Sequence, residues 1–151
     1  MGWSSRRICI VAIMLLAIVL TGCKTNKLQG IEGKWVLDNN TMMIIQKDGF
    51  YWFQDYQNND KNYFFGKDVT ILSGEDALNA IGVPDENRET LLKTHTYYLS
   101  VTYSQYNVDG KDNSQMLDGQ LSEFAIQMDQ KDHLIIINLL NNEQYLARRY
   151  L

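Results

Sequence analysis

The first feature of the hydrophobic pattern is an unbroken apolar run near the start of the chain. The run extends from Ile8 to Leu20 and follows two arginines, Arg6 and Arg7. A spanning helix needs about 20 apolar residues, whereas a positively charged start and an apolar core of roughly 7–15 residues are typical of a secretory signal. The pattern therefore predicts a cleaved export signal, with an ordinary transmembrane helix as the alternative.

From residue 34 onward, apolar and polar side chains mostly alternate with a period of two, which is the pattern of half-buried β-strands. Trp35 and Leu37 begin the series, and the most regular alternation places Phe124, Ile126 and Met128 on one face. The strand over residues 62–72 contains a glycine at position 66, where we expect a bend or bulge. The predicted strands cover residues 34–38, 41–46, 50–55, 62–72, 97–103, 123–128, 133–140 and 143–149.

The pattern changes to a helical period between residues 73 and 93. Ser73 and the acid at Asp76 have the spacing of a capping box, and Gly82 and Pro84 separate two short helices. Short strands joined by tight turns, with one helical pair inserted, predict a mainly β fold, a small antiparallel meander or barrel. Because short helices are marginal alone, we expect the pair to pack as a plug or lid on the barrel, or else outside the sheet near residues 50–65.

The apolar run ends in Leu20-Thr21-Gly22-Cys23, which resembles the lipobox of bacterial lipoproteins. The resemblance implies that the thiol of Cys23 receives a diacylglyceryl group and that a signal peptidase cuts before it. It thus implies a signal peptide over residues 1–22, a tether over 23–30 and a domain over 31–151. Two or three acyl chains anchor a protein stably, so the expected location is the extracytoplasmic face of the cell membrane.

The charge of the chain narrows the range of partners. Loss of residues 1–22, which hold two arginines and no acid, would lower the net charge from −4 to −6. Such an acidic domain is a poor nucleic-acid binder, because neutralisation of phosphates supplies much of that affinity. Cys9 would leave with the signal and Cys23 would carry the lipid, so no intramolecular disulfide is expected.

A second resemblance lies at the start of the first predicted strand. Gly33-Lys34-Trp35 is similar to the Gly-x-Trp motif that opens lipocalins. In that family the tryptophan closes the base of the barrel and a late arginine packs across it. The resemblance implies a lipocalin-like barrel with Trp35 in this structural place and Arg148 or Arg149 as the arginine, of which we take Arg148. It implies no particular ligand.

Residues that commonly carry chemistry are isolated in this sequence. His95 and His133 lie beside strand starts, and neither has a second His or Cys at metal-ligand spacing. The polar stretch 107–113 lacks the spaced acids of a calcium loop, so Asp109-Gly110 is predicted to be a turn. No convergent acid–base or nucleophile set is visible. We expect no metal, no cofactor and no enzymatic activity.

The remaining candidates are aromatic residues on two consecutive predicted strands, 50–55 and 62–72. A period of two places them on both faces, so one set should fill the core while the other covers the helices, lines a cavity or meets a partner. We expect a binding protein for a small apolar ligand or an envelope partner; the alternative is a structural or accessory envelope protein with a filled barrel. The candidate binding residues are Tyr51, Trp52, Phe53, Tyr63, Phe64 and Phe65.

Overall fold

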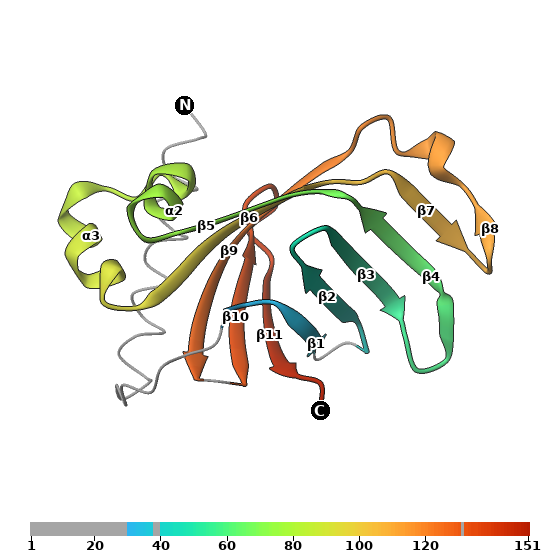
Figure 1. Cartoon of the computed structure of the whole chain (residues 1–151), viewed down its shortest axis with the longest axis horizontal. Coiled ribbons are helices and arrows are strands. Elements are labelled where there is room, and N and C mark those ends of the chain that lie inside the picture. Colours follow the sequence, from blue (N-terminus) through green and yellow to red (C-terminus); the bar gives the residue numbers. More distant parts are fainter. Residues whose placement is uncertain (1–29, 38–39, 131) are drawn as a thin grey trace.

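The structure is a computed structural model that describes residues 30–37, 40–130 and 132–151. The expected signal peptide, Cys23 and the tether up to residue 29 lie outside these residues. The described part of the chain forms one curled antiparallel sheet of eleven strands with two short helices at one end (Figure 1). This confirms the predicted mainly β meander with an inserted helical pair.

The described residues form eleven strands, where the pattern predicts eight. Hydrogen-bonded neighbours follow the order β5-β6-β9-β10-β11-β1-β2-β3-β4-β7-β8. The helices α2 (Gly74–Ile81) and α3 (Asp85–Leu92) connect β5 to β6, and a short 3₁₀ turn η1 (Ser114–Met116) precedes β9. The strands are β1 (Gly33–Leu37), β2 (Met42–Gln46), β3 (Gly49–Asp55), β4 (Asn59–Gly66), β5 (Asp68–Ser73), β6 (His95–Thr102), β7 (Gln105–Val108), β8 (Lys111–Asp112), β9 (Leu121–Gln130), β10 (His133–Asn138) and β11 (Gln144–Arg149).

The bend between β4 and β5 brings distant parts of the sheet together. The two strands are separated by Lys67 alone, yet β4 pairs with β3 and β7 while β5 pairs with β6. A Cβ at Gly66 would lie 2.3 Å from Cγ2 of Val101 and 2.7 Å from the carbonyl oxygen of Thr102. The glycine therefore allows the backbones to approach closely, and the bend expected in the predicted strand 62–72 is confirmed.

The main core lies on the inner face of the curled sheet. Every second residue of β6, β9 and β10 points into it, as the period of two predicts. The strand β10, expected to be the most buried, has four consecutive buried residues from Leu134 to Ile137. The fully buried members of this core with the largest side chains are Trp35, Phe50, Ile31, Met43, Ile45, Leu99, Ile126 and Leu134.

The helical pair packs on the outer face of the sheet, so the expected lid over the interior is wrong. Leu78, Ile81 and Leu91 are buried against the strand residues Ala125 and Ile137. These two strand residues alternate with inward-facing neighbours, which gives β9 and β10 an apolar outer side that needs a cover. The pair lies over β6, β9 and β10, and the alternative site near residues 50–65 is also wrong.

The start of α2 differs from the predicted capping box. Ser73 is the N-cap residue, but its side chain makes no capping hydrogen bond. Instead, the guanidinium of Arg88 on α3 contacts Glu75 at 2.8 Å and Asp85 at 3.2 Å. Gly82 ends α2 with a φ of 79°, as expected of a glycine stop.

Two strands, β7 and β8, were not predicted. They flank the expected turn at Asp109-Gly110, where both residues have positive φ, and they continue the sheet beyond β4. Their residues are mostly polar and partly or fully exposed, so they show no period of two. Pairing with β4 determines this hairpin, and the hydrophobic pattern does not.

Candidate functional site

A pocket of about 180 Å³ opens on the inner face of the sheet, and we call it the aromatic pocket. Strands from both ends of the chain build it: β3, β4, β9, β10 and β11 each contribute one or two residues. None of its lining side chains carries a formal charge at neutral pH. They are Trp52, Phe64, Tyr103, Gln120, Ser122, Phe124, Asn138 and Tyr145.

Sheet register and ring contacts position the aromatic walls of the pocket. Trp52 on β3 is the cross-strand partner of Phe64 on β4. The Trp52 ring stacks on Phe124 with centroids 5.9 Å apart and planes 7° apart, and it meets the edge of Tyr145 at 5.6 Å. On the other side, Phe64 lies 5.3 Å from Tyr103. Each ring is held by at least one other, so the pocket is largely pre-formed.

The tyrosine hydroxyl groups of the pocket stay protonated at neutral pH. Burial raises the pKa of Tyr103, and a hydrogen bond with Ser122 partly opposes this. Burial, then the hydrogen bond to Glu143 and its charge, raise the pKa of Tyr145 to about 12. The pocket therefore offers neutral hydroxyl and amide groups, which suit an uncharged ligand.

The six predicted binding residues divide between the two faces of the sheet. Trp52 and Phe64 line the aromatic pocket. The other four lie on the outer face, where the cross-strand pairs Tyr51–Phe65 and Phe53–Tyr63 form a continuous group that we call the outer aromatic patch. Their ring centroids are 4.6 to 6.0 Å apart. The prediction therefore joined two separate surfaces, and only two of its six residues belong to the pocket.

Six of the pocket residues were not predicted as binding residues. Tyr103, Phe124 and Tyr145 belong to the predicted strands 97–103, 123–128 and 143–149. The period of two places Tyr103 and Phe124 on core-facing positions. Gln120, Ser122 and Asn138 are ordinary polar residues next to or within strands, and no local signal distinguishes them. Their proximity depends on the pairing of β6, β9 and β10.

Arg149 packs on the ring of Trp35 in the Gly-x-Trp motif. The prediction that Arg148 takes this place is therefore wrong. The guanidinium carbon of Arg149 lies 4.2 Å from the centroid of the Trp35 ring, while the indole nitrogen donates to the carbonyl oxygen of Ile31 at 2.8 Å. Arg149 is the cross-strand partner of Trp35, whereas Arg148 pairs with Val36 and points to the outer face. Sheet register decides which arginine packs on the tryptophan.

A second pocket of about 650 Å³ lies at the end of the sheet where the described chain begins. Its walls are mainly aliphatic, and Glu32 and Lys47 add one charge of each sign. It borders Gly30, from which the chain leads back towards Cys23. The remaining lining residues are Ile31, Val69, Ile71 and Tyr97.

The two histidines of the sequence lie on the separate strands β6 and β10. His95 and His133 both occupy exposed first positions of strands. Among residues 30–37, 40–130 and 132–151, no group of three or more His, Cys, Asp or Glu side chains has a metal-binding arrangement. A search of the same residues finds no helix of the length and apolarity needed to cross a bilayer.

Comparisons with known proteins were made at three levels. No model of a protein family matches the chain, and neither a curated protein nor a solved structure matches it.

Proposed function

We propose that this chain is a lipid-anchored extracytoplasmic lipoprotein whose barrel binds a small uncharged ligand in the aromatic pocket. The observation that carries the ligand proposal is the pocket itself: five aromatic rings and three neutral polar side chains converge on about 180 Å³. Apolar walls with a few convergent polar groups are the usual composition of a ligand site. The protein acts by binding and not by catalysis.

The size of the pocket limits the ligand, or the part of it that enters, to about one ring. A dry cavity of about 150 Å³ accommodates benzene, and the pocket is slightly larger. Gln120, Ser122 and Asn138 offer amide and hydroxyl groups to a polar edge of such a ring. A ligand that brought a charge into the pocket would find no charged partner among the lining side chains, which makes its desolvation costly.

The lipid anchor is supported by the sequence Leu20-Thr21-Gly22-Cys23 and by where the described domain begins. Gly30 is the seventh residue after Cys23, and a flexible segment of seven residues spans about 13–16 Å. The barrel would therefore stand next to the bilayer, with the aromatic pocket open to the extracytoplasmic space.

A ligand titration tests the binding proposal. A soluble form that begins at Leu28 is titrated with benzyl alcohol and with methyl glucoside, two uncharged single-ring probes, while tryptophan fluorescence reports on Trp52. We expect a saturable change with at least one probe and none with benzoate. Asn138→Leu, which fills the pocket, should abolish the change. Gln144→Leu, on the outer side of β11, is the matched control and should preserve it.

A structural or accessory role is the second candidate, and one observation favours it. Most of the barrel interior is filled by the main core, in which sixteen buried residues pack together. In that case the protein would act through its outer face and the aromatic pocket would be a packing feature. If neither neutral probe binds the folded wild-type domain, the ligand proposal fails and the structural role remains.

A further inference from the structure

We infer that the outer face of β1 to β4 docks onto the anionic phospholipid bilayer that holds the lipid anchor, and that this contact orients the barrel. The inference rests on the lipid anchor proposed above, and it does not depend on the aromatic pocket. It concerns the outer aromatic patch, which the ligand proposal leaves without a role.

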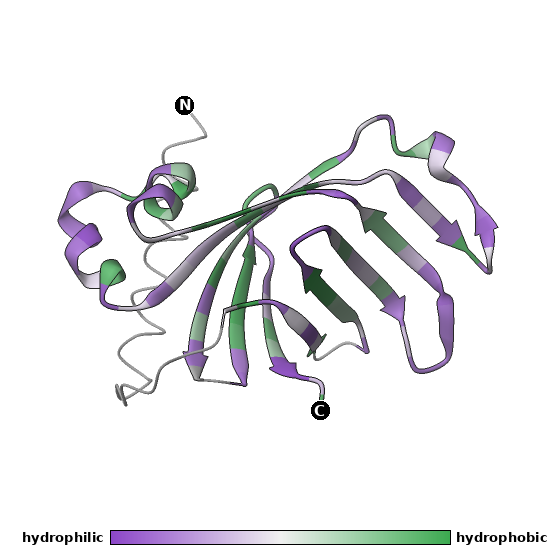
Figure 2. Ribbon diagram, in the orientation of Figure 1, coloured by the Kyte–Doolittle hydropathy of each residue, from purple (hydrophilic) through white to green (hydrophobic). Residues whose placement is uncertain are grey.

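The outer aromatic patch is unusual for the solvent side of an antiparallel sheet. Such a face normally carries polar residues, but here Tyr51, Phe53, Tyr63 and Phe65 are all partly exposed on it. The apolar surface continues onto neighbouring strands through Ile44, the cross-strand partner of Tyr51, and through Val36, both partly exposed, whereas Met42 is buried. In Figure 2 β2 is mainly hydrophobic, and β3 and one end of β4 contain hydrophobic segments. Contiguous apolar surface of this kind marks a site of protein or membrane contact.

The charges around the patch favour an anionic lipid surface as the partner. The outward positions of these strands include the cation Lys34, beside Ile44, and the anion Asp55, two residues beyond Phe53. Arg148 projects from the adjacent β11 next to Val36, and both cations are exposed. The acid at the far end of β3, Asp55, is bonded to Asn40 and Asn58. Basic residues beside an apolar surface are the usual arrangement for binding anionic lipid.

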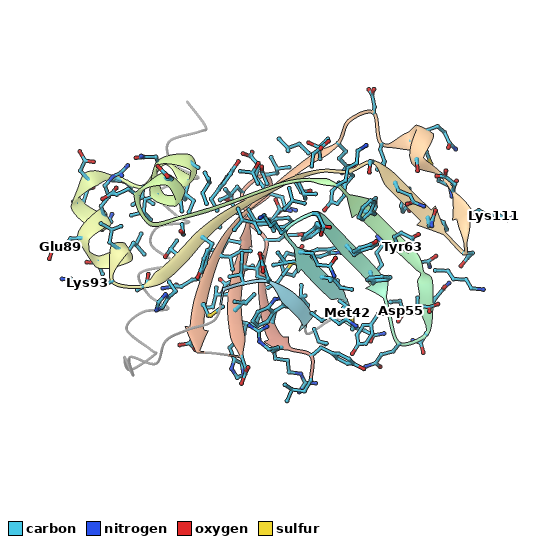
Figure 3. All side chains as sticks on the ribbon, in the orientation of Figure 1. Met42, Asp55, Tyr63, Glu89, Lys93 and Lys111 are labelled. Atoms are coloured by element: carbon cyan, nitrogen blue, oxygen red, sulfur yellow. The ribbon has the colours of Figure 1, made fainter. Side chains whose placement is uncertain are left out.

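The helical end of the molecule is acidic and lies away from the outer aromatic patch. Glu89 and Lys93 on α3 lie far from Tyr63 and Met42 (Figure 3). The two helices and their flanks carry five acids against two basic residues: Glu75, Asp76, Asp85, Glu86 and Glu89 against Arg88 and Lys93. This segment carries a net charge of −3, half of the −6 of residues 23–151. Repulsion from an anionic bilayer therefore favours the orientation with the helices outward and β1 to β4 inward.

The position of the anchor agrees with this orientation. The described chain begins at Gly30, three residues before β1, and Lys34 follows directly in β1. A tether that spans about 13–16 Å brings the start of β1, in the middle of the strand order, to the headgroups first. Tyrosine and phenylalanine side chains are suited to that depth, because tyrosine combines an apolar ring with a polar end. The Tyr63 hydroxyl is already hydrogen-bonded by Asn107 at 2.6 Å.

A fluorescence-quenching experiment on the full chain tests the docking. The lipidated protein has no free thiol if Cys23 is acylated, so Ile44→Cys introduces a single site for an environment-sensitive fluorophore. Glu89→Cys on α3, whose parent side chain is 87% exposed, is the matched control. Each labelled protein is placed in vesicles of phosphatidylcholine with or without phosphatidylglycerol, and quenching by aqueous iodide and by brominated lipid is measured.

In phosphatidylglycerol vesicles we expect iodide quenching at position 44 to be several-fold weaker than at position 89. Brominated lipid should quench the label at position 44 and leave that at position 89 unaffected. Adding Lys34→Gln should lower the ratio of docked to free barrel about fivefold, which corresponds to about 1 kcal/mol per basic residue at an anionic surface. The same change should have no effect in pure phosphatidylcholine.

Two results would overturn the docking while leaving the anchor in place. Equal iodide quenching at positions 44 and 89 would show that the face is free in water. Protection at position 44 without quenching by brominated lipid would assign the face to a second copy or another protein. A separate result concerns the anchor itself: if the parent chain takes up the label, Cys23 is a free thiol, and both the anchor and the docking fail.

Discussion

The substitution Gly33→Ala tests the contact between the Gly-x-Trp motif and Arg149. Gly33 has a φ of 139°, a region that essentially only glycine occupies. A Cβ at this position would lie 2.6 Å from Nη1 of Arg149. That nitrogen donates to the carbonyl oxygen of Glu32 at 3.1 Å, so the guanidinium would have to leave both this oxygen and the Trp35 ring.

The expected loss of stability has two parts. A non-glycine residue in such a backbone region costs about 1–3 kcal/mol. The contact of a guanidinium with an aromatic face contributes about 0.5–2 kcal/mol, and the Arg149 side chain is only 15% exposed. We therefore expect Gly33→Ala to lower the free energy of unfolding by about 2–4 kcal/mol, a large share of the 5–15 kcal/mol typical of a domain.

Urea unfolding of the soluble form that begins at Leu28, followed by tryptophan fluorescence, measures this loss. A double-mutant cycle with Arg149→Met separates the parts: in that background, Gly33→Ala should retain the backbone cost alone. Arg148→Met is the matched control and should change stability by less than about 0.5 kcal/mol, as exposed substitutions usually do. A loss below about 1 kcal/mol for Gly33→Ala would refute the reasoning.

Three other predictions follow from the structure. Leu91→Ala should lower the free energy of unfolding in urea by about 2–5 kcal/mol, because Leu91 is fully buried between α3 and the sheet. The neighbouring Leu92 is 43% exposed, so Leu92→Ala should cost under about 1 kcal/mol. Equal costs would contradict the packing of α3. Burial and Glu123 raise the pKa of Tyr98 from 10.0 to about 12. The stability that protonated Tyr98 contributes should therefore be complete below pH 10 and lost as the pH rises to about 12. Over this range, the urea midpoint of Tyr98→Phe should fall less than that of the wild type. Cys23→Ala should leave an uncleaved and unlipidated precursor, and equal incorporation of a palmitate analogue by wild type and variant would exclude the lipid anchor.

Local pattern was sufficient to predict the helical pair and the longer strands of this fold. Alternation with a period of two identified the longer strands, since a half-buried strand must present apolar residues to one side. Gly82 marks the helix end for a local steric reason, whereas Gly66 marks a bend at which the backbone approaches Val101, 35 residues further along the chain. Strands β7 and β8 were not predicted, because their mostly polar residues are held by strand pairing and not by burial. β7 pairs with β4, and β8 pairs with β7.

The aromatic residues show where local pattern stops being informative. Period two separates Trp52 and Phe64 from Tyr51 and Phe65, but it does not say which pair faces inward. That choice depends on the registers of β3 with β2 and of β4 with β3. Because a shift of one residue would exchange the two faces, the pocket and the outer aromatic patch could be told apart only in the folded sheet.

The sequence by itself determined the helical pair, the longer strands and the Gly-x-Trp motif, because each depends on residues that are near one another in the chain. Tertiary structure decided that Arg149 and not Arg148 packs on Trp35, and that the helices cover the outside of the sheet. It also brought Ser122, Asn138 and Tyr145 to one pocket. These outcomes depend on pairings between distant strands, whose register is set by burial across the whole sheet.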